Sequence, residues 1–282
     1  MRIHRLSLRN ESGMTILEVL ITALLSTIVI GSVLGFYVSL HDSWITQQNV
    51  SEMQQSLRVS VDELVSKLRN AGAGLPIGLA GIVGADANPD TIMVRFSATP
   101  SSLLVGDPTS NRQAVPIHVE RFSDLSDFEV GERVYIYRPP SGPGEFFTIT
   151  NLSDNAGTGW KEVHHQDEDL ITDPEPGDII FKMVEARYWI DQSADSLHPR
   201  FIREVSGQGN VYAEEISDLQ FRYTLKDGSV VDQTAPGDTV FAVDLSLAAM
   251  TVKRNLTIAG DEGRLNRAAQ TNVVLRNHPA AN

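Results

Sequence analysis

A single carboxylate, that of Glu18, stands in an apolar run that is otherwise uncharged. The run covers residues 14–40 and consists mainly of Leu, Ile, Val, Ala, Gly, Ser and Thr. A charged side chain at the centre of a bilayer costs about 2.5–3.5 kcal/mol, and less near an interface. The chemistry open to Glu18 is therefore pairing with a cationic group that offsets this cost. The alternative is a plain membrane anchor whose Glu18 side chain reaches the lipid headgroups.

The second feature with chemical meaning is Gly13, which immediately precedes the apolar run. An ordinary secretory signal has its small-residue cleavage site after a short apolar core. Here a cut after Gly13 would remove only residues 1–13, which carry Arg2, Arg5 and Arg9. Such a cut would trim the chain and leave its apolar segment attached.

The run 14–40 is long enough to cross a membrane as a helix. At 1.5 Å per residue it would measure about 40 Å, against about 30 Å of bilayer hydrocarbon. The preceding arm has three Arg residues and one acid, Glu11. Since positively charged flanks stay on the cytoplasmic side, we expect a cytoplasmic N-terminus and an exported C-terminal part.

These residues together resemble the signature of type IV prepilins. The match consists of Gly13, Met14 and Glu18, with apolar positions around them filled as in the family by Thr15-Ile16-Leu17 and Val19-Leu20-Ile21. The resemblance implies that a prepilin peptidase cleaves between Gly13 and Met14 and that the new amine of Met14 is methylated. It also implies that Glu18 meets the N-terminal amine of a neighbouring subunit. The family usually has Phe after the cut, but Met14 is also a large apolar residue, and we expect processing to tolerate it.

The helix is expected to continue beyond the membrane over residues 41–75. Apolar residues recur there every three or four positions, which is typical of an amphipathic helix: Val50, Met53, Leu57, Val61, Leu64 and Leu68. No proline interrupts residues 14–75, and the sequence from Gly72 to Pro76 is a helix end signal.

Two glycines in the membrane half, Gly31 and Gly35, have the Gly-x-x-x-Gly spacing. This spacing allows close approach of two helices, whereas each glycine also weakens a helix locally. Both interpretations, helix packing and local flexibility, remain open from the sequence.

Beyond Pro76 the chain is rich in β-branched and aromatic residues, separated by Gly, Pro and Asp turn formers. Strands are expected at 91–97, 115–122, 133–138, 145–152, 179–190, 201–205, 219–225, 240–251 and 271–276. The expected fold class is α+β, with a long N-terminal helix packed on an antiparallel β-sheet head over 76–282. A weak seam near 139–177 would divide this head into two sheet subdomains.

Composition limits the functions that the exported part can have. The formal net charge is −13, and loss of residues 1–13 would make the remainder more acidic. Phosphate binding needs a positive face, so direct nucleic-acid binding is not expected. The absence of cysteine excludes disulfides and thiol catalysis.

The densest group of candidate metal ligands or catalysts is the sequence 164–169, His-His-Gln-Asp-Glu-Asp. Adjacent residues of a strand point to opposite faces, so His164 and His165 are poorly placed to share a metal, and a solvated polar loop is the better interpretation. Residues 154–159 have oxygen donors but lack the spaced acids and closing Glu of an EF-hand loop. No catalytic or phosphate-binding motif occurs. We therefore expect a protein that is not an enzyme and has no cofactor or metal.

Short stretches of the head are similar to the larger minor pilins of the W type, and also to the J-type minor pseudopilins of type II secretion. They are Leu68–Gly72, Arg187–Ile190 with Leu197–Glu204, Ile216–Tyr223 and Val273–Asn277. Glu18 distinguishes the chain from K-type tip subunits, which usually lack this residue.

The resemblance implies a structural subunit that initiates or caps a type IV pilus near its tip. Its partners would be prepilin peptidase, other major and minor pilins, and the inner-membrane assembly platform. It would be an inner-membrane protein with a periplasmic head, which becomes extracellular in the pilus. The alternatives are a pseudopilin of type II secretion and, from another class, a single-pass anchored binding protein or enzyme.

Overall fold

The computed structural model describes most of the chain from Gly13 onward. The described residues are 13–103, 117–119, 128–138, 144–154, 161–165, 170–171, 173–193, 195–205, 207–252 and 264–277. The basic arm with Arg2, Arg5, Arg9 and Glu11 lies outside them. The chain divides into two compact units, residues 1–51 and 52–282.

One helix, α1 (Ile16–Asn70), accounts for the helical part of both units. Its continuation beyond the apolar run confirms the expected long N-terminal helix. The helix ends at Asn70, and turns over residues 71–74 follow. Gly72 and Gly74 adopt φ values of 80° and 73°, which favour glycine and cannot continue a right-handed helix. The last residues of the predicted 41–75 segment are therefore turns.

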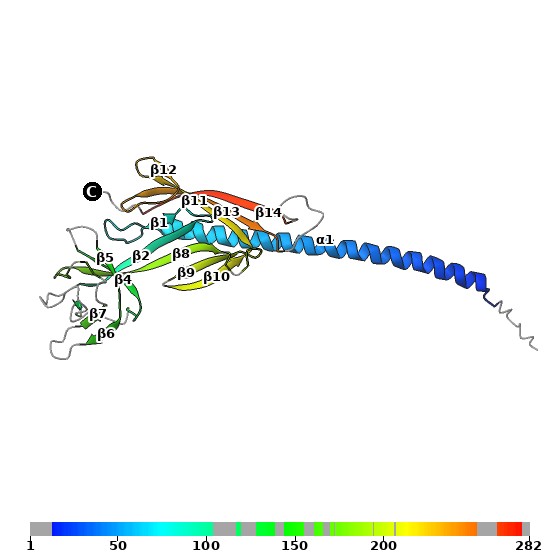
Figure 1. Cartoon of the computed structure of the whole chain (residues 1–282), viewed down its shortest axis with the longest axis horizontal. Coiled ribbons are helices and arrows are strands. Elements are labelled where there is room, and N and C mark those ends of the chain that lie inside the picture. The colour runs from blue at the N-terminus through cyan, green and yellow to red at the C-terminus, as the bar shows by residue number, and fades with distance from the viewer. Residues whose placement is uncertain are drawn as a thin grey trace, which may run out of the picture. The chain divides into compact units, whose positions relative to one another are not determined.

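The largest sheet has seven strands, and all of its pairings are antiparallel (Figure 1). Its strands are β1 (Ile82–Ala85), β2 (Thr91–Leu103), β4 (Arg133–Tyr137), β5 (Glu145–Thr148), β8 (Ile179–Asp191), β9 (Arg200–Val205) and β10 (Gln208–Glu214). Five of them follow the order β1-β2-β8-β4-β5, while β9 pairs with β8 and β10. The long strand β8 is thus the centre of this sheet.

Two smaller antiparallel sheets complete the unit 52–282. The second sheet of the head has the order β12-β11-β13-β14, and its strands are β11 (Ile216–Leu225), β12 (Val230–Val231), β13 (Val240–Met250) and β14 (Asn266–Val274). The third sheet has the order β3-β7-β6, with β3 (Ile117–Val119), β6 (Asn151–Asp154) and β7 (Lys161–His164). The α+β class with antiparallel sheets is confirmed.

Several strands differ from the expected ones. The predicted strand 145–152 is two strands, β5 and β6, because the backbone N–H groups of Ile149 and Thr150 donate to Glu132 and His164 outside the ladder. The strands β1, β7, β10 and β12 were not predicted. The strands β1, β7 and β12 have only two to four residues, and β10 is mostly exposed, so none of them has the long alternation of apolar and polar residues that predicts a strand.

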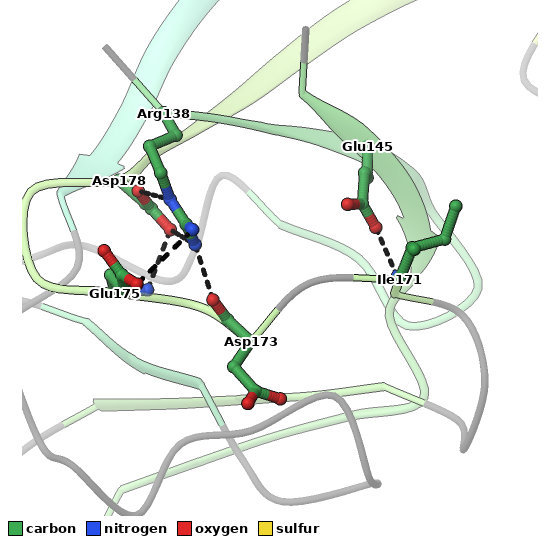
Figure 2. A network of polar contacts seen from close by, with 6 residues as sticks. All are labelled: Arg138, Glu145, Ile171, Asp173, Glu175 and Asp178. Carbon is green, nitrogen blue, oxygen red and sulfur yellow. Dashed lines mark hydrogen bonds and ion pairs between the residues drawn. The ribbon is translucent and has the colours of Figure 1, made fainter. Parts of the chain in front are cut away.

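Residues 52–282 form one compact unit, and the seam expected near 139–177 stays a prediction. Val163 of β7 belongs to one buried cluster with Val134, Phe147 and Ile180 of the large sheet. The described residues around the seam are also held by Arg138 (Figure 2). Its guanidinium donates to both carboxylate oxygens of Asp178 at 2.8 and 2.7 Å, and to the Asp173 carbonyl.

The segment of α1 in the unit 52–282 buries one face. Met53, Leu57, Leu64 and Leu68 are buried at helical spacing, as the periodicity predicts. Polar contacts fix this face on the large sheet through Glu63, whose carboxylate accepts hydrogen bonds from the Tyr188 hydroxyl at 2.8 Å and from Arg203 at 3.2 Å.

Asp90 joins the loop before β2 to the second sheet. Its side chain is 2% exposed and accepts hydrogen bonds from the backbone N–H groups of Ala87 and Phe221 at 3.0 and 2.7 Å. Burial raises the pKa of Asp90, aided by the negative charges of Asp86 and Asp218 and opposed by the two hydrogen bonds. The two sheets are therefore connected by a carboxylate whose ionisation is costly.

The raised pKa of Asp90 predicts a pH-dependent contribution to folding. A carboxyl whose pKa is higher in the folded state than its ordinary value of 3.8 destabilises the fold when ionised, and the penalty disappears as pH falls through the folded pKa. Asp90→Asn removes the charge but also one acceptor, which costs about 1–3 kcal/mol. We expect the loss of stability caused by Asp90→Asn to be larger at about pH 4 than at pH 7. Urea unfolding of both proteins at the two pH values measures this, and a pH-independent difference would contradict it.

Candidate functional site

The candidate site residues Gly13, Met14 and Glu18 lie in the first turn of α1 or immediately before it. Thr15 immediately precedes the helix, and its hydroxyl accepts a hydrogen bond from the Glu18 N–H at 3.3 Å. In return, the Glu18 carboxylate accepts the Thr15 N–H at 3.4 Å. This reciprocal arrangement is a capping box. Sequence reasoning missed this role of Thr15, although the Thr-x-x-Glu pattern signals it.

The capping box gives the Glu18 carboxylate a defined position within its own chain. It lies in the first turn of the helix, where the helix dipole favours negative charge by about 0.3–1 kcal/mol. Gly13 and Met14 precede the helix in irregular backbone, and both are exposed. The peptide bond between Gly13 and Met14 therefore lies outside regular secondary structure, between two exposed residues.

The surface of α1 around this site is apolar and uncovered. Large hydrophobic side chains are more than 50% exposed along most of the run: Met14, Ile16, Leu17, Leu20, Leu24, Leu25, Ile28, Val29, Ile30, Val33, Leu34, Phe36, Tyr37, Val38 and Leu40. The helix is long and apolar enough to cross a membrane. A continuous apolar surface of this size needs lipid or other helices around it.

Three hydroxyl groups within this apolar surface are satisfied by the helix itself. Thr22, Thr27 and Ser32 donate to the carbonyl oxygens four residues earlier, at 2.7, 2.8 and 2.8 Å. Such bonds lower the cost of placing hydroxyls in an apolar medium. Glu18 is the one formally charged residue that the described part of the apolar run presents to its surroundings.

The glycines of the Gly-x-x-x-Gly pair both lie within the continuous α1 helix. No atom comes within 4 Å of a Cβ built at Gly31 or at Gly35. The helix is continuous at both residues, and the two interpretations of this glycine pair, helix packing and local flexibility, stay predictions.

The candidate ligand group of the head is only partly within the described residues. His164 is half-buried at the end of β7, with its Nε2 atom 2.8 Å from the Ser153 hydroxyl. His165 is buried and lies edge-on to Phe147. The predicted solvated loop is therefore wrong for these two residues, because His165 packs into the core. Positions 166–169 and 155–160 lie outside the described residues, within which no group of three His, Cys, Asp or Glu side chains could hold a metal.

Comparison with known proteins gives a similarity in structure. No protein-family model and no curated protein matches the chain. Among solved structures, it is similar to a type IV-like pilin from Thermus thermophilus, with 11% sequence identity and a TM-score of 0.38. The match covers 79% of this chain and 95% of the other.

Proposed function

We propose that this chain is a minor type IV pilin, a structural subunit that enters a helix-cored filament near its tip. The observation that carries the proposal is the combination at the start of α1. A potential cleavage site, Gly13-Met14, precedes an exposed apolar helix whose only formally charged residue in the run 14–40 is Glu18. In a filament of bundled helices, the apolar surface would be covered by neighbouring subunits, and Glu18 would pair with the amine of another Met14.

The proposed route begins with insertion of the helix in the inner membrane, with residues 1–13 in the cytoplasm and the head in the periplasm. Prepilin peptidase then cleaves after Gly13, and Met14 is methylated. The inner-membrane platform adds the subunit to major and minor pilins, and Gly31 and Gly35 allow a neighbouring helix to approach. The head, residues 76–282, would face outward as the displayed part of the subunit.

Intact mass spectrometry of the membrane-extracted protein tests this route. We expect loss of residues 1–13 and gain of one methyl group on Met14, and we expect both changes to be absent in cells that lack the prepilin peptidase. An unprocessed chain in peptidase-containing cells, or a cut beyond Leu40, would contradict the proposal and favour an anchored or secreted binding protein. Recovery of the processed chain from sheared pili distinguishes a pilus from a secretion pseudopilus.

A further inference from the structure

The second sheet presents a polar outer face that the proposed assembly function does not use. Its inner face consists of buried apolar residues: Leu219, Phe221, Tyr223, Val243, Leu245, Leu247 and Val273. The alternate residues of β11, β13 and β14 point the other way. The strand register places six of them in two adjacent rows, Gln220-Ser246-Gln270 and Arg222-Asp244-Asn272.

These two rows line a hollow of about 490 Å³ on β11, β13 and β14. The hollow arises because the middle strand carries the short Ser246 between two longer side chains, Gln220 and Gln270. Phe221 and Leu245 also border the hollow, but both are almost fully buried beneath the sheet. Amide, hydroxyl and charged groups of the two rows form the polar part of the walls, and the rest of the lining is apolar. We call these six residues with Asp232 the polar trough.

Several groups of the polar trough are already held in place by their neighbours. Asn272 donates to Asp244 Oδ1 at 2.7 Å, Gln220 donates to Asp218 Oδ1 at 3.0 Å, and Arg222 lies 3.4 Å from Asp232. No hydrogen bond to another described residue engages the Ser246 hydroxyl or the Gln270 amide. Both can donate and accept, so the trough offers oriented polar groups to a ligand.

The chemistry of these groups restricts the ligand class. An acidic polymer is disfavoured because the chain carries a net charge of −13 and the trough contains one cation, Arg222, against Asp232 and Asp244. A protein partner would call for an exposed apolar or aromatic centre, whereas the two large apolar side chains at the trough, Phe221 and Leu245, are almost fully buried. An added β-strand needs a sheet edge, and this is a sheet face. Hydroxyl-rich, uncharged ligands match groups that both donate and accept.

We propose that the polar trough binds a neutral carbohydrate chain. The ring hydroxyls would exchange hydrogen bonds with Ser246, Gln270 and Asn272, while Ser246 leaves room for a sugar ring above β13. This inference does not depend on filament assembly, because it rests on the second sheet alone. A chain that was only membrane-anchored would retain the same trough.

Binding is tested with the full-length chain in phosphatidylcholine nanodiscs, which present no sugar of their own. The probes are neutral hexasaccharides of glucose, mannose, galactose and N-acetylglucosamine at millimolar concentration, followed by saturation-transfer NMR and calorimetry. We expect at least one probe to bind. Gln270→Ala should weaken it about five- to tenfold, and Ser246→Trp, which fills the trough, by more than about tenfold. Asn151→Ala, at an exposed strand position of β6, is the matched control and should change affinity less than about twofold.

Three results would overturn the inference. The first is no binding of any of the four probes, and the second is binding that Gln270→Ala leaves unchanged. Gln270→Ala alters an exposed side chain of β14, so it keeps the test decisive if Ser246→Trp fails to fold. The third result is binding of an added acidic probe, polygalacturonate, without binding of any neutral probe, or a change in self-association of the Gln270→Ala variant without a change in its sugar binding. Either outcome assigns the face to another partner.

Discussion

Replacement of Glu18 by glutamine is expected to exclude the chain from filaments while its processing continues. Glutamine keeps the length of the side chain and can still accept the Thr15 N–H, so the capping box is retained. Only the charge is lost. An unpaired carboxylate costs about 2.5–3.5 kcal/mol at the centre of a bilayer and less near an interface, and pairing with an amine during assembly would recover this energy. We therefore expect incorporation of Glu18→Gln to fall by up to roughly a hundredfold.

The measurement is the amount of the chain in sheared filaments relative to the membrane fraction, by quantitative immunoblot. Thr15→Val is the matched control, because it removes the hydroxyl of the capping box and retains the Glu18 charge. Loss of a helix cap costs about 0.5–2 kcal/mol, so this variant should be incorporated far better than Glu18→Gln. Incorporation of Glu18→Gln at the level of the unchanged chain would show that the charge only serves membrane anchoring.

The second large effect is expected at Glu63, which fixes α1 to the large sheet. The Glu63 carboxylate is 11% exposed and receives donors from Tyr188, Arg203 and Tyr212, at 2.8, 3.2 and 3.5 Å. Burial raises the pKa of the Tyr188 hydroxyl, and its bond to Glu63 raises it further. Tyr188 is itself fully buried. Glu63→Leu would leave these donors without their acceptor.

We expect Glu63→Leu to lower the free energy of unfolding by about 2–4 kcal/mol. Removal of one partner from a buried ion pair typically costs about 3–5 kcal/mol, and the figure is lower here because Arg203 is 36% exposed and is partly solvated. Glu63→Gln, which keeps two polar groups at this place, should cost less. Urea unfolding of the full chain in nanodiscs, followed by near-ultraviolet circular dichroism, measures both.

The neighbouring Asp62 provides the control for Glu63. Its side chain is 72% exposed and faces Arg58 on the same helix at 3.7 Å. An exposed pair contributes little, so Asp62→Asn should change the free energy of unfolding by less than about 0.5 kcal/mol. Equal effects of Glu63→Leu and Asp62→Asn would show that the helix is held by its apolar face alone.

The parts of this protein that could be predicted from its sequence are those that depend on neighbours along the chain. A helix repeats every 3.6 residues and an apolar run shows no gaps, so the continuity of α1 from the apolar segment into the amphipathic one was visible in the spacing of Met53, Leu57, Leu64 and Leu68. The long strands β2, β8 and β13 could also be predicted, because β-branched and aromatic residues are frequent in their sequences. The Gly13-Met14 and Glu18 combination is likewise contained in six consecutive residues.

Tertiary structure alone decided how distant segments meet. Glu63 and Tyr188 are 125 positions apart, and Asp90 and Phe221 are 131 positions apart, so no local pattern indicated that these pairs form. The short strands β1, β10 and β12 exist because a partner strand supplies their hydrogen bonds, which their own sequences do not signal. The polar trough depends on the register of β11, β13 and β14: a shift of one residue would turn Gln220, Ser246 and Gln270 toward the core. Sequence by itself determined the helix and its candidate assembly site, whereas long-range pairing determined which polar groups of the head lie together.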